Sequence, residues 1–81
     1  MTFNYKKNKL EQLKGFCVTV ECGNSINDAG VKSNISATTI SKQISSLEED
    51  LGFLLFDRIK NRLVLNKEGM LYYKKKLKQL E

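Results

Sequence analysis

The sequence predicts a small domain that is mostly α-helical and carries one short β-hairpin. Apolar residues recur at steps of three and four along most of the chain, which is typical of helices. After Gly52 the pattern changes to a run of β-favouring residues with a turn signal inside it. Eighty-one residues allow one domain with a modest core and leave little room for a catalytic cleft. With no His and no cofactor-binding loop, the sequence gives no indication of an enzyme.

The positive charge is concentrated toward the end of the chain. The net charge is +5, yet residues 58–81 alone hold eight basic and two acidic side chains. The remaining residues are therefore close to neutral. A basic segment of this kind indicates an anionic partner, either nucleic acid or a membrane surface. The alternative is a solvated lysine-rich tail that aids solubility. Charge alone does not distinguish such a tail from a segment that binds an anionic partner.

Few residues could carry metal or redox chemistry. Cys17 and Cys22 are the only cysteines, and without a His they fall short of the roughly four ligands of a zinc site. We expect no metal and no cofactor, with Cys17 in the core and Cys22 in a loop of a protein from a reducing cytoplasm. No apolar run is long enough to cross a bilayer, and the N-terminus lacks the apolar segment of a secretory signal.

Two helices are predicted in the first part of the chain. The first covers about residues 8–21, and its apolar face consists of Leu10, Leu13, Phe16, Cys17 and Val20. After the stop signal at residues 23–24, Ser25 is a suitable N-cap for a short second helix over residues 26–33. The inward face of this second helix consists of Ile26, Ala29 and Gly30. Asn34 tolerates left-handed backbone angles and is expected to make a tight turn.

A longer third helix follows the turn. Ser36 is its predicted N-cap, with Thr39 at the third helical position, and Gly52 supplies the left-handed residue that ends it. Its buried stripe consists of Ile40, Ile44, Leu47 and Leu51. We expect this stripe to hold the helix in place, because the first half of the segment has weak helix propensity.

The rest of the chain predicts a hairpin and a last helix. Residues 53–59 and 63–65 favour strands, and Lys60-Asn61 can turn between them. Asn66 is expected to cap a helix over residues 67–81. The heptad-like seam of that helix consists of Met70, Tyr73, Leu77 and Leu80. The seam could pack on its own domain, but its terminal position favours a partner helix.

This order of elements is that of a winged helix-turn-helix domain, here residues 1–65, followed by a linker helix, here residues 66–81. In such domains the helix after the turn, about residues 36–51, lies in the DNA major groove. The hairpin, about residues 55–65, contacts the DNA backbone or the minor groove. Short side chains at the start of the third helix allow a close approach to DNA. Its free N–H groups and positive dipole favour phosphate.

Five segments carry a resemblance to a known family, namely "LEQLKGF", "GNSINDAG", "ISATTISKQISSLEEDLG", "LLFDR" and "LVLNKEG". In order and spacing they resemble the DNA-binding domain of LysR-type transcriptional regulators over nearly the whole chain. The third segment resembles the recognition helix, and the last resembles the Leu-Thr-x-Ala-Gly that opens the family's linker helix. The resemblance implies double-stranded DNA as a partner and a homodimer formed through the last helix.

The resemblance places one face of the third helix in the major groove. The residues implied are Ala37, Thr38, Ser41 and Lys42, with Ser45 next on that face and Thr39 beside a phosphate. A solvated polar face is the alternative. In the hairpin, Lys60 and Arg62 are expected at phosphates or the minor groove. Arg58 is expected either at a phosphate or paired with Glu48 or another acid of the segment "EED". Asn27 is a further candidate for a phosphate contact.

Three departures from the family pattern affect these expectations. Ala37-Thr38 replaces Gln-Pro, so Ala37 cannot donate the usual hydrogen bond to a base, although it can touch a thymine methyl. Gly30 replaces an Ala, which weakens the second helix by about 1 kcal/mol on propensity. Ser33 stands where the family has a core Leu. We expect either that Val31 supplies part of that packing or that the core is weaker there.

The leading hypothesis is a sequence-specific DNA-binding transcriptional regulator, dimeric through the seam of the last helix. It is expected in the bacterial cytoplasm, on the nucleoid when bound. The alternative is an interaction modulator that forms a heterodimer with a full-length regulator. The family normally continues into an effector-binding domain, whereas this chain stops within the linker helix. We therefore expect no small-molecule effector site in it. The last helix lacks the wide apolar face of a membrane-binding helix, so no membrane partner is expected.

Overall fold

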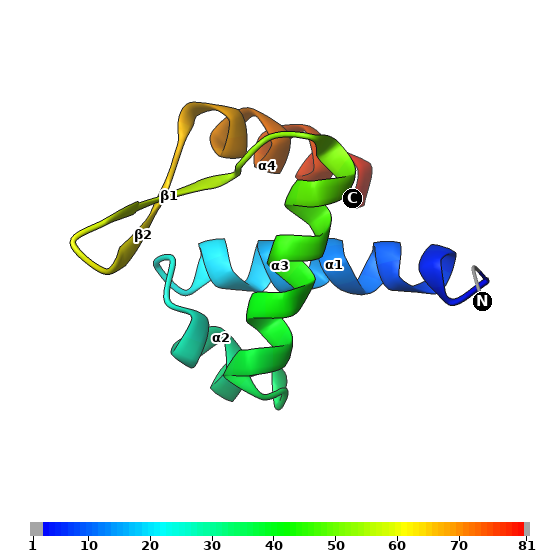
Figure 1. Ribbon diagram of the computed structural model, residues 1–81, viewed down its shortest axis with the longest axis horizontal. Helices are drawn as coiled ribbons and strands as arrows, with labels where there is room; N and C mark the ends of the chain where they lie inside the picture. The colour runs from blue at the N-terminus through cyan, green and yellow to red at the C-terminus, as the bar shows by residue number, and fades with distance from the viewer. Residues whose placement is uncertain (1–2, 81) are drawn as a thin grey trace.

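The computed structural model describes the backbone of residues 3–80 and the side chains of residues 9–77. Its elements, in order, are α1 (Phe3–Glu21), α2 (Ile26–Ser33), α3 (Ala37–Leu51), β1 (Phe56–Ile59), β2 (Arg62–Leu65) and α4 (Lys67–Leu80). Figure 1 shows α3 crossing α1, α4 beside the carboxyl end of α3, and the hairpin projecting to one side. The predicted winged helix-turn-helix with a final helix is confirmed.

The contact between α1 and α3 is more polar than predicted. Leu10, predicted on the apolar face of α1, is 52% exposed, whereas Gln12 is only 2% exposed. Gln12 Nε2 donates a hydrogen bond of 2.7 Å to Ser46 Oγ on α3, whereas its buried Oε1 has no hydrogen-bond partner among the described residues. The buried Thr19 hydroxyl donates to the Gly15 carbonyl oxygen at 2.7 Å within α1. Helix α1 also begins at Phe3, earlier than the predicted start near residue 8.

The turn between α2 and α3 is as tight as predicted. Asn34 has φ 60°, and the Ile35 N–H donates to the Gly30 carbonyl oxygen at 3.0 Å. A Cβ on Gly30 would lie 2.6 Å from the Ile35 carbonyl oxygen and 3.3 Å from the Ala37 nitrogen. Gly30 therefore permits this close approach of the two backbones, although it lowers the helix propensity of α2.

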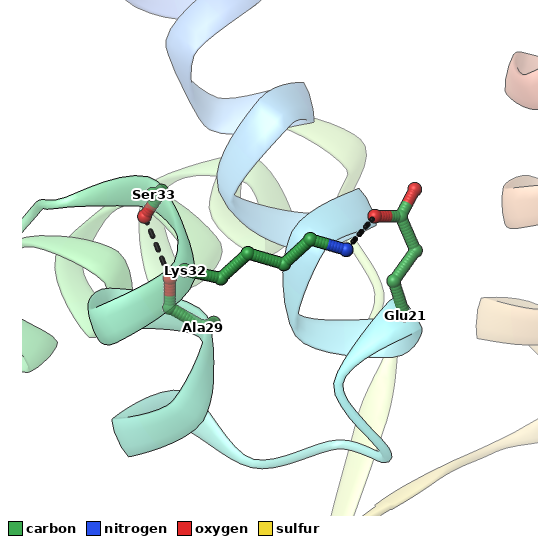
Figure 2. Close-up of polar contacts among 4 residues, drawn as sticks. All are labelled: Glu21, Ala29, Lys32 and Ser33. Atoms are coloured by element: carbon green, nitrogen blue, oxygen red, sulfur yellow. Dashed lines mark hydrogen bonds and ion pairs between the residues drawn. The ribbon is translucent and has the colours of Figure 1, made fainter.

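Helix α2 is tied to α1 by one exposed ion pair. Lys32 Nζ lies 3.4 Å from Glu21 Oε1, and Figure 2 marks this ion pair with a dashed line. The same view shows the Ser33 hydroxyl donating to the Ala29 carbonyl oxygen, at 2.6 Å, so Ser33 satisfies its own polar group where the family has a Leu. The expectation that Val31 would fill this part of the core is wrong, because Val31 is 83% exposed.

Helix α3 has the predicted caps and stripe. Ser36 Oγ accepts from the Thr39 N–H at 3.1 Å, and Gly52 ends the helix with φ 82°. Ile40, Ile44 and Leu47 are buried, and Leu51 is half-buried. The stripe joins Phe16, Cys17 and Ala29 in one core cluster.

Phe16 lies at the centre of that core with no exposed surface. Its ring packs against Phe56 of β1 at a centroid distance of 5.6 Å, with the planes 66° apart. The rings of Tyr72 and Tyr73 on α4 lie 5.8 and 6.1 Å from it. Edge-to-face contacts of this kind add to the burial free energy of each ring. One residue of α1 therefore fixes both the hairpin and α4.

The hairpin begins later than the sequence predicted. Strand β1 starts at Phe56 rather than Phe53, and Phe53 and Leu54 lie exposed in a loop. The strands are antiparallel, with Phe56 opposite Leu65 and Arg58 opposite Leu63. Lys60 and Asn61, at φ 52° and 63°, form the predicted two-residue turn.

Helix α4 is joined closely to the loop before the hairpin. Asn66 caps it, since its Oδ1 accepts from the Gly69 N–H at 2.7 Å. The Asn66 N–H donates to the Leu55 carbonyl oxygen at 3.0 Å. Of the predicted seam, Met70 and Leu77 are exposed, but Tyr73 packs on Phe16 and is half-buried. The side chain of Leu80 lies outside the described residues.

Burial also sets the acidity of the core thiol and phenols. Burial, and then the nearby Glu21 carboxylate, raise the pKa of the Cys17 thiol above its ordinary value of 9.0. Burial, followed by smaller contributions from neighbouring charges, raises the pKa of Tyr72 and of Tyr73. Because the folded state favours the neutral forms, their contribution to stability is complete below about pH 9 and is lost as the pH rises further.

Gly69→Ala is expected to destabilise the protein by about 1–3 kcal/mol. A Cβ there would collide with the Leu55 carbonyl oxygen and the Leu65 side chain, which outweighs the better helix propensity of Ala. Urea denaturation followed by circular dichroism measures the change. Lys74→Ala, at an exposed position of the same helix, is the control and should change stability by less than about 0.5 kcal/mol. Equal stability of the two variants would contradict the close approach of α4 to Leu55.

Cys17 is expected to react with iodoacetamide more slowly than Cys22 near pH 8, because the thiolate is the reactive form. Cys17 is buried with a raised pKa, whereas Cys22 is half-buried in the turn after α1. Peptide mass spectrometry gives the two rates separately. The same measurement in urea is the control, where both thiols should react alike. Equal rates in the folded protein would rule out the protected position of Cys17.

Candidate nucleic-acid interface

The outer face of α3 carries the side chains predicted to contact DNA. Thr38, Thr39, Lys42 and Ser45 are exposed on it, and Ala37 and Ser41 are half-buried. These six residues are here called the outer face. Thr38, Lys42 and Ser45 lie opposite the buried stripe, Thr39 and Ser41 lie at its edges, and Ala37 lies one turn before Ile40 on the stripe's side of the helix. The side chains of the outer face are short except for Lys42, which leaves the helix backbone accessible to a large partner.

The start of α3 is built by the turn and the cap. The Ala37 backbone lies close to Gly30, so this end of α3 is seated on α2. Besides accepting from the Thr39 N–H, the Ser36 hydroxyl donates to Thr39 Oγ1 at 2.9 Å. The cap fixes the Thr39 side chain at the exposed amino end of the helix. A helix start of this kind presents N–H groups and a partial positive charge to anions.

A polar recess of about 620 Å³ separates the start of α2 from the hairpin. Three predicted DNA-contact residues, Asn27, Arg58 and Arg62, line it together, with Asn61 of the turn between the strands. Arg58, Arg62 and Asn27 are all exposed. Two arginines line this concave surface, here called the α2–wing recess, beside the start of α2, and their positive charges suit it to an anion.

A smaller recess of about 230 Å³ connects the hairpin to the outer face of α3. Ser41 and Ser45 line it from α3, and Arg58 and Leu63 line it from the strands. Arg58 thus belongs to both recesses, so the outer face of α3 and the α2–wing recess form one continuous surface. Lys60, at the hairpin tip, lines neither recess and extends the positive charge outward.

Glu48 positions the hairpin in a way that the sequence did not reveal. Its Oε2 accepts from the backbone N–H groups of Leu55 and Phe56, at 2.8 and 3.3 Å. The expected ion pair with Arg58 is absent from the described part of the chain. The carboxylate therefore braces the entry to β1 through the backbone and leaves Arg58 at the surface. The one signal of this role in the sequence is an acidic residue one turn before Gly52.

Other kinds of site find no support among residues 9–77. No group of three His, Cys, Asp or Glu side chains in that range could hold a metal ion. None of the described helices is long and apolar enough to span a membrane.

Comparison with known proteins agrees with this geometry. The model of the family described as "Bacterial regulatory helix-turn-helix protein, lysR family" matches residues 10–70. The uncharacterized HTH-type transcriptional regulator YeiE of Escherichia coli K12 is 39% identical over 72 residues, which cover 89% of this chain and 24% of YeiE. The HTH-type transcriptional regulator YtlI of Bacillus subtilis is 40% identical over 67 residues, 83% of this chain and 21% of YtlI. The chain thus spans about a quarter of the length of these relatives.

Solved structures with the same fold include DNA complexes. The BenM DNA-binding domain, crystallised with catB site 1 DNA, has a TM-score of 0.80 and 34% identity, with 88% of this chain and 79% of that chain covered. The DNA complex of the CbnR DNA-binding domain has a TM-score of 0.78 and 28% identity, with 86% and 79% covered. The chain belongs to the LysR family of bacterial regulatory helix-turn-helix proteins.

Proposed function

We propose that the chain binds double-stranded DNA sequence-specifically as the recognition domain of a transcriptional regulator, with α3 in the major groove. The observation that carries this proposal is the continuous surface formed by the outer face of α3 and the α2–wing recess. Arg58 is shared by its two parts and, freed from Glu48, is available to a phosphate. Similar proteins are regulators by name, and two similar domains were crystallised on DNA, which supports this surface as the DNA side.

The two parts of this surface have different roles in the proposal. In the α2–wing recess, Arg58 and Arg62 with Asn27 hold one backbone phosphate, and Lys60 adds charge beside it. Such contacts set the position of the domain on the duplex without selecting a sequence. Selection falls to the outer face of α3, where Lys42 can donate to guanine O6 or N7 and Thr38 can touch a thymine methyl.

The proposal includes a homodimer formed through α4, acting in the bacterial cytoplasm. The partly apolar exposed surface of α4 supports a helix partner, and two recognition domains would bind two half-sites. The comparisons lend no support to a heterodimer with a different regulator, and no observation on the chain favours one.

Lys42→Ala is expected to weaken binding to a selected DNA site by about tenfold or more, since a good base contact is worth about 1–3 kcal/mol. Sites selected from random duplex DNA provide the probe, and fluorescence anisotropy at several salt concentrations gives the affinity. Lys14→Ala, an exposed lysine on α1, removes the same charge and should weaken binding far less. Failure of the unmodified protein to bind any duplex at low salt would refute the proposed function.

Glu48→Ala is expected to lower both stability and DNA affinity, although it removes a negative charge from a DNA-binding domain. The N–H groups of Leu55 and Phe56 would lose their acceptor, at a cost of about 1–3 kcal/mol. Glu49→Ala is the matched control, because it removes the same charge from an exposed neighbouring position. It should leave stability nearly unchanged and strengthen DNA binding slightly. Identical behaviour of the two variants, in urea denaturation and anisotropy, would contradict the brace.

A further inference from the structure

Two residues near the start of α1 have the reverse of the burial that a closed core would give them. Leu10 is 52% exposed, whereas Gln12 is only 2% exposed. An exposed leucine gives up the free energy of burial, and a buried amide needs partners for both of its polar atoms. Both residues line one recess with a volume of about 470 Å³, here called the three-helix recess.

Side chains of α1, α3 and α4 together line the three-helix recess. Those that are apolar or aromatic are Leu10 and Leu13 of α1, Leu47 and Leu51 of α3, and Tyr72 of α4. A concave surface of this size, lined largely by apolar side chains with a few polar groups among them, is typical of a site for a small molecule. The recess shares no residue with the outer face of α3 or with the two recesses beside the hairpin.

Gln12 gives this recess one unmet hydrogen-bonding group. Its Nε2 donates to Ser46 Oγ at 2.7 Å, but its Oε1 is buried and has no hydrogen-bond partner among the described residues. Because the bond to Ser46 holds the amide in place, Oε1 cannot turn to solvent unless that bond breaks. A buried acceptor without a donor costs free energy. A molecule in the recess that carries an N–H or O–H group can supply the missing donor.

The charged residues of the recess do not favour a charged molecule. Lys9, Asp50 and Lys76 also line it, and each has an interaction within the domain. Lys76 Nζ, for example, lies 5.5 Å from the centre of the Tyr72 ring. A further charge placed among them would have to give up its hydration and compete with these interactions. The lining therefore favours a neutral molecule, and an aromatic body suits the leucines and the Tyr72 ring.

We propose that the three-helix recess binds a neutral aromatic molecule with one N–H or O–H donor, which it directs to Gln12 Oε1. The ring of the molecule packs against Leu10, Leu51 and Tyr72. Because the bound molecule contacts α1, α3 and α4 at once, its binding holds α4 against the helix-turn-helix. This proposal departs from the expectation, based on the sequence, that the chain has no site for a small molecule.

The first experiment compares indole with 1-methylindole, two probes of nearly the same shape of which only indole has an N–H donor. Indole is expected to raise the midpoint of thermal unfolding of the whole chain, because it binds the folded state. Titration calorimetry should show 1-methylindole binding about three- to tenfold more weakly, since it cannot donate to Gln12. Equal affinities of the two probes, or no binding of indole, would overturn the proposal.

The second experiment locates the bound indole with variants whose fold is verified by circular dichroism. Leu10→Trp fills the recess from an exposed position and should lower the affinity for indole by about tenfold or more. Leu54→Trp is the matched control, because Leu54 is equally open to substitution, at 60% exposed, but lines a separate groove beside α4. It should leave the affinity unchanged.

Gln12→Leu removes the acceptor and should abolish the preference for indole over 1-methylindole. Loss of indole binding in Leu54→Trp but not in Leu10→Trp would place the molecule in the other groove and overturn the proposal. None of these measurements uses DNA, so their failure would leave the proposed DNA-binding function unaffected.

Discussion

The packing of three rings around Phe16 is the contact on which the arrangement of the domain depends. The helix-turn-helix is held by apolar residues of α1, α2 and α3, but the hairpin and α4 have few core residues of their own. Phe56 and the two tyrosines of α4 all meet Phe16 in the core. Because all three rings share one neighbour, the positions of hairpin and final helix are linked. A shift of α4 would therefore also displace β1.

Hydrogen bonds to the backbone also hold the hairpin and α4 in position. Glu48 binds the N–H groups at the entry to β1, and the Leu55 carbonyl oxygen accepts from Asn66 at the start of α4. Residue 55 is therefore held from both sides, by α3 through its nitrogen and by α4 through its oxygen. The hairpin carries the arginines of the α2–wing recess, so this one residue connects the recognition helix, the wing and the proposed dimer helix. A shift of α4 would reach the arginines of the α2–wing recess by this route.

Local features were predictable from the sequence, and features that depend on a distant partner were not. The caps Ser25 and Ser36 and the stripe from Ile40 to Leu47 follow from neighbours within one helix. The burial of Gln12, by contrast, needs Ser46 on another helix, and the inward turn of Tyr73 needs Phe16. For the candidate site, periodicity separated the exposed Thr38, Lys42 and Ser45 from the buried stripe of α3. It could not show that the hairpin folds back beside α2, which brings Asn27 to the two arginines.

The division of α3 into two faces has a consequence for how such proteins diversify. Ile40, Ile44 and Leu47 secure the helix in the core, while Thr38, Lys42 and Ser45 take no part in that packing. Effects of substitutions at sites that share no partners are nearly additive. After a gene duplication, the outer residues of one copy can therefore change without a compensating repair elsewhere in the fold. If these residues select the operator, as proposed above, new regulatory circuits can arise by exchange of a few surface side chains.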